Sequence, residues 1–238
     1  MSDDSPAEGA KNRNERRQVR SFVRREGRLT PGQQRALDDL WPKFGIDGGT
    51  DPLDFRKLFG RDAPVWLEIG FGNGDALLEM ATGHPEHDWL GIEVHRPGVG
   101  RLLRGLEARE IDNVRVLRDD AVEVLKNRIP DTSLAGVCLF FPDPWPKKRH
   151  HKRRILQPGF AALVRNRLQP GGLFHFATDW EEYAGWTLRV LEQTPGLENL
   201  AGPGRFSPRP AERPLTRFEH RGVDLGHGVW DLWLRRSG

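Results

Sequence analysis

Short apolar runs recur along this chain at nearly regular intervals, and polar, helix-forming stretches separate them. The runs occupy residues 65–69, 89–94, 113–117, 135–141 and 172–177. Runs of this length, bounded by turn residues, are typical of buried strands. Their alternation with helical patterns predicts repeated βα units, which build a parallel sheet. The pattern therefore favours an α/β fold.

The stretches around these runs complete the expected architecture. Helical patterns cover residues 96–109, 121–128, 158–168 and 180–193, whereas Pro and Gly crowd residues 195–214 and predict a loop. Near the C-terminus, the β-prone segments TRFEHRG and VWDLWLRR flank the turn DLGHG and predict a hairpin that joins the sheet in antiparallel fashion. We therefore expect a seven-stranded mixed sheet with helices on both faces, the Rossmann-like architecture of class I methyltransferases.

The N-terminal part of the chain differs from the rest in composition. Residues 1–20 predict a disordered arm, residues 21–60 a basic N-terminal extension, and residues 61–238 the catalytic domain. The single cysteine, Cys138, lies in an apolar run, and no Cys/His spacing of a metal site occurs, so we expect no metal. No apolar segment resembles a signal peptide or a membrane helix, and we expect a cytoplasmic protein without membrane contact.

Charge is unevenly distributed along the chain, although the formal net charge is only +3. Residues 11–28 hold eight Lys and Arg against two Glu, and residues 147–154 hold six Lys and Arg without an acid. Each segment thus carries a net charge of +6, which leaves −9 for all other residues. An acidic body with two basic segments indicates a polyanionic partner bound at defined places.

The sequence VWLEIGFGNGD joins the first predicted strand to a glycine turn. Gly70 and Gly72 suit a turn with unusual φ and ψ whose backbone contacts a ligand without interference from a Cβ atom. The dinucleotide fingerprint requires a further glycine where this chain has Asp75, and a carboxylate there repels a pyrophosphate. Together with Glu68, it suits a cationic ligand such as S-adenosylmethionine. The alternative is that Glu68 is a strand-end charge and Asp75 a helix N-cap.

Acidic residues stand at the carboxyl ends of all five predicted strands, where ligands bind in open α/β sheets. Glu93 lies at the distance from the glycine turn where a carboxylate accepts the ribose hydroxyls, and Asp120 is placed to accept the adenine amino group. Any one of these acids is also typical of a helix cap, but five in register favour a ligand site. The set is Glu68, Glu93, Asp119-Asp120, Asp143 and Asp179.

The fourth strand is followed by FPDPWPKKRHHKRR. Its three prolines restrict the backbone and hold Asp143 and Trp145 in place. An acid beside a Pro-aromatic pair at this strand end is similar to the segment that grips a flat base in amino-methyltransferases. The basic residues that follow indicate phosphate contacts, and the alternative is a solvated loop. We interpret His150 and His151 as part of that surface rather than as catalytic groups.

These segments together resemble the bacterial tRNA (guanine-N7-)-methyltransferase family. The resemblance rests on LEIGFGNG, GIEVHRPG, FPDPWPKKRHHKRR, FATDWEEYA and TRFEHRG, with SFVRREGRLTPGQ before the domain. It extends from about residue 20 to the C-terminus. It implies methyl transfer from S-adenosylmethionine to N7 of a guanosine in the variable loop of tRNA, forming 7-methylguanosine.

The resemblance also implies a role for each matching residue. Glu68, Glu93, Asp120 and Asp143 would bind S-adenosylmethionine, and Asp143 would also lie at the catalytic centre. The residues that would hold the guanosine are Lys147, Asp179, Thr216, Arg217, Phe218 and Glu219. Those that would contact the RNA are Arg149, His150, His151, Lys152, Arg153 and Arg154.

The chemistry of guanine N7 agrees with this set of residues. N7 is unprotonated at neutral pH, so the enzyme chiefly aligns it with the methyl carbon and excludes water. Nearby carboxylates such as Asp143 and Asp179 can stabilise the cationic product. The alternatives are a nicotinamide-dependent oxidoreductase, an RNA-binding module without activity, and a DNA amino-methyltransferase. The sequence leaves a monomer and a homodimer both open.

Overall fold

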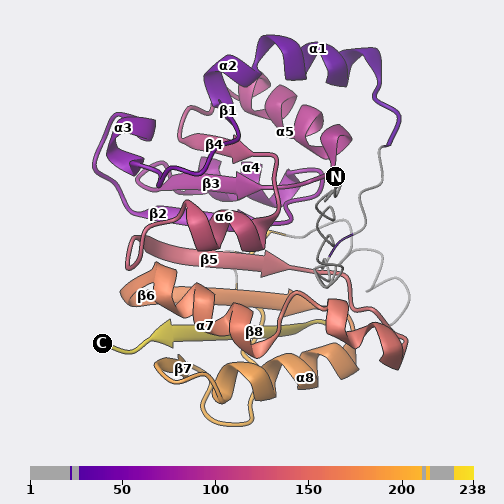
Figure 1. Cartoon of the computed structure of the whole chain (residues 1–238), viewed down its shortest axis with the longest axis vertical. Helices are drawn as coiled ribbons and strands as arrows, with labels where there is room; N and C mark the ends of the chain where they lie inside the picture. The colour runs from indigo at the N-terminus through magenta and orange to yellow at the C-terminus, as the bar shows by residue number, and fades with distance from the viewer. Residues whose placement is uncertain (1–21, 23–26, 211–212, 215–227) are drawn as a thin grey trace, which may run out of the picture.

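The computed structural model describes residues 22, 27–210, 213–214 and 228–238. Within them, one mixed sheet of eight strands has the order β1-β4-β3-β2-β5-β6-β8-β7. Neighbours pair in parallel from β1 to β6, whereas β8 pairs antiparallel with both β6 and β7. Figure 1 shows this order from β1 near the top to β7 near the bottom.

The bounds of the elements follow the pattern of apolar residues closely. The strands are β1 Gly45–Ile46, β2 Val65–Ile69, β3 Asp88–Ile92, β4 Val114–Leu117, β5 Leu134–Phe140, β6 Leu168–Thr178, β7 Leu197–Asn199 and β8 Trp230–Arg236. The α-helices are α1 Pro31–Asp39, α2 Trp41–Phe44, α3 Phe55–Phe59, α4 Asp75–Gly83, α5 Arg96–Ala108, α6 Ala121–Asn127, α7 Pro158–Arg167 and α8 Glu181–Glu192, and a 3₁₀ helix, η1, spans Lys148–Arg153.

The expected fold class is confirmed, but the described sheet has eight strands rather than seven. The five predicted parallel strands and four predicted helices lie within a few residues of their expected positions. The two strands that the sequence did not predict are β1, which has only two residues, and β7, which lies in the stretch predicted to be a loop. Strands this short display no alternation of apolar and polar residues, so the pattern cannot indicate them. The first segment of the predicted hairpin, 216–222, lies outside the described residues.

Two apolar cores lie on opposite faces of the sheet because successive strand side chains alternate between the faces. On one face, Leu67 and Ile69 belong to a core that α6, α7 and α8 cover. On the other, Trp89 and Cys138 belong to a core shared with α1, α4 and α5. Figure 1 shows α6 and α7 in front of the strands and α8 along the lower edge, beside β7. Among the described helices, none combines the length and apolar composition that crossing a bilayer requires.

The order of the strands defines where a ligand binds. From β2 the chain proceeds to β3 and β4 on one side, and then returns to β5 and β6 on the other side of β2. The carboxyl ends of β2 and β5 therefore flank a topological switch point, the usual position of ligands in open α/β sheets. The glycine turn lies directly after β2, and the PDPW segment directly after β5.

Candidate active site

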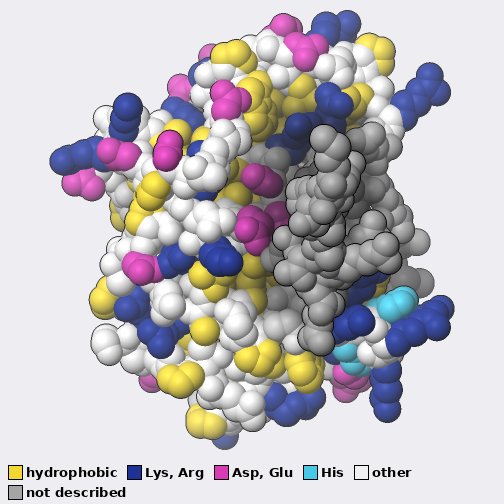
Figure 2. Space-filling model, in the orientation of Figure 1, with side chains coloured by type: hydrophobic (Ala, Val, Ile, Leu, Met, Phe, Trp, Pro, Cys, Tyr) yellow, Lys and Arg dark blue, Asp and Glu magenta, His cyan; other side chains and the backbone are white. Residues whose placement is uncertain are grey.

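A cavity of about 310 Å³ opens at this switch point. Its wall is formed by the carboxyl ends of β2, β3 and β5, by the glycine turn, and by the start of the loop after β5. Sequence-predicted residues in its lining are Glu68, Gly70, Gly72, Glu93 and Asp143. In Figure 2, acidic side chains gather near the centre of the visible face, while Lys, Arg and His side chains gather over the segment that follows β5.

The glycine turn presents bare backbone to the cavity. Gly70 and Gly72 have φ angles of 71° and 57°, in the left-handed region that favours glycine. A Cβ atom built on either residue would meet no atom within 4 Å, so the space beside the turn is open to a ligand. The turn is held by a hydrogen bond from Gly70 N to Ile92 O at 2.8 Å. Its backbone is thus fixed while its surface stays accessible.

Glu68 is the least solvated acidic group of this cavity. It lies near the end of β2, is only 3% exposed, and its Oε2 accepts no hydrogen bond from the described residues. Burial, and secondarily the charge of Glu93, raises the pKa of Glu68 to about 8. A buried carboxylate without a donor is costly, so a cationic or hydrogen-bond-donating ligand would stabilise it.

Glu93 is already well hydrogen-bonded and points at the glycine turn. Its Oε2 accepts a hydrogen bond from Gly72 N at 2.8 Å. Its Oε1 accepts from Val94 N at 2.7 Å and from His95 N at 2.9 Å. These bonds fix the carboxylate in the cavity wall, use both lone pairs of Oε1 and leave one lone pair on Oε2 for a hydroxyl donor.

After β4, the structure separates the two adjacent aspartates. Asp120 is the N-cap of α6, and its Oδ1 accepts a hydrogen bond from Val122 N at 3.0 Å. The cavity lining contains Asp119 rather than Asp120, and Asp119 accepts a hydrogen bond from Asp120 N at 2.7 Å. Adjacent acids after a strand cannot be told apart by sequence, because the cap position decides which one faces the ligand.

The loop after β5 holds Asp143 at the cavity with an unusual backbone. Phe141 and Trp145, on either side of Asp143, have φ angles of 48° and 45° although neither is glycine. Such conformations are uncommon, cost energy, and cluster at functional sites. The loop is fastened by hydrogen bonds from Phe141 N to Ala177 O and from Arg154 Nε to Pro144 O, each at 2.8 Å.

Arg154 differs from the other basic residues of this segment. It is only 1% exposed, its guanidinium pairs with Glu182, and it lies 4.8 Å from the centre of the Tyr183 ring. Its side chain therefore holds the loop on α8 and does not face solvent. By contrast, Lys147, Arg149 and Lys152 are exposed.

The other described residues of the predicted site follow β5 and β6. Arg153 and His150 both pack on Trp145, with the Arg153 guanidinium 4.6 Å from the ring centre. His151 is half-buried near Glu182, and Asp179 follows β6 and is half-buried outside the cavity lining. The predicted guanosine-binding residues Thr216, Arg217, Phe218 and Glu219 lie outside the described residues.

Sequence reasoning missed a buried polar cluster beneath the loop. His175 on β6, Asp231 on β8 and Arg213 are each at most 2% exposed. His175 Nε2 lies 2.7 Å and Arg213 Nε 2.8 Å from Asp231 Oδ1, and the Arg213 guanidinium lies 5.7 Å from the centre of the Phe141 ring. Burial lowers the pKa of His175, although Asp231 opposes the shift. In the sequence, Asp231 matches the polar positions of an alternating strand, so no signal indicated its partners.

The sheet order, the glycine turn and the carboxylates at the strand ends define the class I methyltransferases. A family model described as "Putative methyltransferase" matches residues 62–232. The solved structure of the 16S rRNA methyltransferase KamB superposes with a TM-score of 0.55 at 16% identity, covering 77% of this chain and 93% of that one. A mutant of the 16S rRNA (adenine(1408)-N(1))-methyltransferase from Catenulisporales acidiphilia, solved with cosubstrate SAM, gives a TM-score of 0.52 at 14% identity, covering 78% and 92%.

A curated relative identifies the family within this class. The tRNA (guanine-N(7)-)-methyltransferase of Alkalilimnicola ehrlichii is 60% identical over 223 residues, which are 93% of this chain and 94% of that protein. The chain belongs to the tRNA (guanine-N(7)-)-methyltransferase family.

Proposed function

We propose that this protein transfers a methyl group from S-adenosylmethionine to N7 of a guanosine in the variable loop of tRNA, in the cytoplasm. The observation that carries the proposal is the buried Glu68 carboxylate, whose Oε2 has no donor among the described residues, in a cavity at the glycine turn. A ligand with a cationic or N–H donor group satisfies this oxygen. The family relationship supports the same conclusion.

The residues of the cavity suit S-adenosylmethionine. Glu68 would accept from its ammonium group, Gly70 and Gly72 would contact it through bare backbone, and Glu93 Oε2 would accept from a ribose hydroxyl. Asp119 or the adjacent Asp120 would accept from the adenine amino group. When bound, S-adenosylmethionine supplies a methyl carbon attached to a sulfonium, which leaves as a neutral thioether.

The chain's own residues align and shield the reacting guanine. Asp143 stands at the cavity wall on a loop that its flanking residues and Arg154 hold rigidly. The N7 lone pair forms the new bond to carbon while the carbon–sulfur bond breaks, and no proton is removed from N7. Positive charge moves from sulfur to the purine, and the Asp143 carboxylate stabilises it there. Asp179, Lys147 and residues 216–219 would hold the guanosine.

The exposed basic residues would bind the RNA backbone. Lys147, Arg149 and Lys152 follow Asp143 within the same loop segment, and their side chains are exposed to solvent. Phosphate contacts of this kind position a nucleic acid without reading its bases. His150, His151 and Arg153 extend this surface, whereas Arg154 acts within the protein.

Nucleoside analysis of treated tRNA tests the proposal. The purified protein, with S-adenosylmethionine and unmodified tRNA, should produce 7-methylguanosine. A tRNA whose variable-loop guanosine is changed to adenosine is the matched control and should remain unmethylated. Methylation of the control would contradict the variable-loop assignment, and the absence of 7-methylguanosine from both would contradict the activity.

A further inference from the structure

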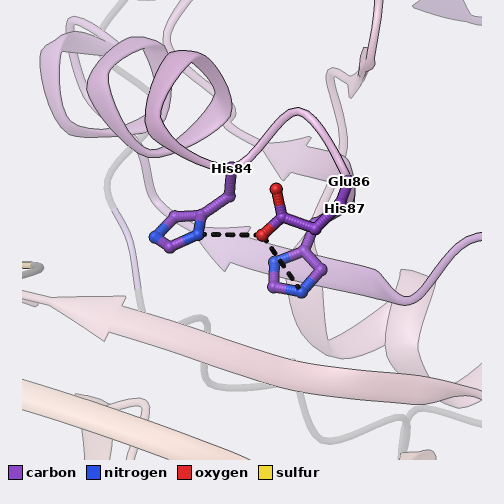
Figure 3. A group of neighbouring side chains, drawn as sticks. All are labelled: His84, Glu86 and His87. Carbon is purple, nitrogen blue, oxygen red and sulfur yellow. Dashed lines mark hydrogen bonds and ion pairs between the residues drawn. The ribbon is translucent and has the colours of Figure 1, made fainter.

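The turn between α4 and β3 brings three metal-binding side chains together. Its sequence is His84-Pro85-Glu86-His87, and one ligand atom from each of His84, Glu86 and His87 lies within 4.8 Å of the other two. In Figure 3, dashed lines join one Glu86 oxygen to a nitrogen of each imidazole ring, and the line to His87 passes across its ring. Among the described residues, no other group of three His, Cys, Asp or Glu side chains has its ligand atoms this close together.

The separations of these atoms suit a small divalent ion. Glu86 Oε1 lies 3.1 Å from His84 Nδ1 and 3.8 Å from His87 Nε2. In a tetrahedral zinc site, bonds to His nitrogen and carboxylate oxygen of about 2.0–2.2 Å place two ligands about 3.3–3.6 Å apart. The two distances from Glu86 lie just below and just above this range, and the three ligand atoms all lie within 4.8 Å of one another, so the side chains must rotate to bring all three atoms onto one ion.

The backbone of the turn is held in place from outside. Asn113 Nδ2 donates to His84 O at 3.4 Å and to His87 O at 2.9 Å. Arg61 donates to Pro85 O and His87 O, each at 2.9 Å, and its charge is balanced by the buried Asp88 at 2.7 Å. A fixed backbone reduces the ordering that a ligand set otherwise requires.

The rings are also constrained by aromatic neighbours. His87 stacks on Trp66 with ring centres 5.9 Å apart and meets Trp89 edge-on at 6.3 Å. His84 stacks on His87 at 5.4 Å. Glu86 remains mostly exposed and leaves a coordination position open to water.

We propose that His84, Glu86 and His87 form a binding site for a divalent transition ion, with Zn²⁺ as the representative ligand. Two imidazoles and one carboxylate suit zinc, whereas Mg²⁺ prefers oxygen ligands alone. The sequence predicts no metal because it lacks the Cys/His spacings of known metal sites. The segment HPEH has two His and one Glu but no cysteine, so it does not match those spacings.

This site is separate from the cavity that binds the methyl donor. It lies where β3 begins, whereas the cavity lies where β3 ends, about 16 Å away for a five-residue strand at about 3.3 Å per residue. The ion would join the end of α4 to the start of β3. It would stabilise the folded protein, because a ligand bound only in the folded state shifts the folding equilibrium.

Calorimetric titration of untagged, chelator-treated protein with Zn²⁺ tests the proposal. The wild type should bind one equivalent that excess Mg²⁺ does not displace, and its melting temperature should rise until that equivalent is filled. The His84→Ala and His87→Ala variants should each bind at least about tenfold more weakly, since even the loss of groups that only orient metal ligands costs that much. Glu86→Gln should also weaken binding.

The control is a His150→Ala, His151→Ala double variant, which removes two histidines elsewhere and should retain the zinc equivalent. Cofactor binding measured in the same His84→Ala sample reports whether the variant is folded, and it should equal that of the wild type. The proposal is overturned if the wild type binds no stoichiometric zinc. It is equally overturned if folded His84→Ala and His87→Ala bind zinc as the wild type does, or if Mg²⁺ competes.

Discussion

Replacing Glu68 by Gln should make the cofactor-free protein more stable at neutral pH and less able to bind S-adenosylmethionine. The folded-state pKa of about 8 lies above the ordinary value of 4.5. At pH values between 4.5 and about 8, the Glu68 carboxyl keeps its proton in the folded protein, whereas it has lost that proton in the unfolded chain. The free energy of unfolding therefore falls as pH rises through this window. Glutamine keeps the shape of the side chain and removes the titration.

The size of this effect follows from the pKa of Glu68. One pKa unit corresponds to about 1.4 kcal/mol, so burying Glu68 at pH 7 costs about 3 kcal/mol of folding stability. At pH 5 the same linkage gives a cost below about 1 kcal/mol. Glu68→Gln should thus gain about 2–3 kcal/mol more at pH 7 than at pH 5. The loss of a charge-assisted hydrogen bond should weaken cofactor binding at least about tenfold.

Urea unfolding at pH 5 and pH 7 measures the stability, and calorimetry measures the cofactor. Binding to the wild type at pH 7 should release close to one proton, because the ammonium group requires the ionised carboxylate. Glu68→Gln should release none. The exposed Glu79, which pairs with Arg109 at 2.7 Å, supplies the control Glu79→Gln, which should match the wild type in proton release. Equal affinity and equal proton release in Glu68→Gln would refute the reasoning.

Further predictions concern the loop after β5 and the reacting atom. Asp143→Ala should lower kcat about 100-fold or more while cofactor affinity changes less, as expected for lost transition-state electrostatics; a folded variant with near-normal turnover would exclude Asp143 from catalysis. Neutralising Arg149, Lys152 and Arg153 together should weaken tRNA binding, with each lost phosphate contact reducing the slope of log K against log salt by roughly 0.7–0.9; an unchanged slope would make the segment a solvated loop. Arg154→Ala should instead lower the melting temperature, because it removes the buried anchor of the loop, and scanning calorimetry of the variant measures this. A tRNA with 7-deazaguanosine at the target should accept no methyl group and one with inosine should accept it; transfer to the deaza substrate would contradict N7 as the nucleophile.

The sequence predicts the fold well where apolar runs are long. It does not predict strands of only two or three residues, which are held by pairing with a distant part of the chain. Residues 65–69 form β2 as expected, because five consecutive strand residues leave a clear pattern. β7 has only three residues and is held by pairing with β8, a contact that no local pattern displays. The apolar run predicts that the fifth strand begins at residue 172, but β6 already begins at Leu168.

The candidate site is predicted less completely, because sequence gives the type of a residue and not its environment. The residues of segment 147–154 are alike in charge, yet Arg154 is buried against Glu182 while Lys152 is exposed. Only the packing of α8 against the loop separates the two. Asp119 and Asp120 differ for a similar reason, since the start of α6 assigns one of them to the helix cap.

The distribution of charge resolves a conflict between the two substrates. A sulfonium cofactor requires a negative cavity, whereas a polyanionic tRNA is repelled by one. In this protein the uncompensated carboxylate is buried at Glu68, where desolvation keeps it largely protonated until a cation arrives. The exposed cations lie outside the cavity on the 147–153 segment, where they face solvent and are the proposed phosphate contacts. The single net positive charge of the cofactor is then offset by the proton that Glu68 releases, so the net charge of the cavity is the same in the empty and in the loaded enzyme. The charge of the cavity alone should therefore not make tRNA bind one form more tightly than the other, and by linkage tRNA should leave the affinity for the cofactor unchanged by this route.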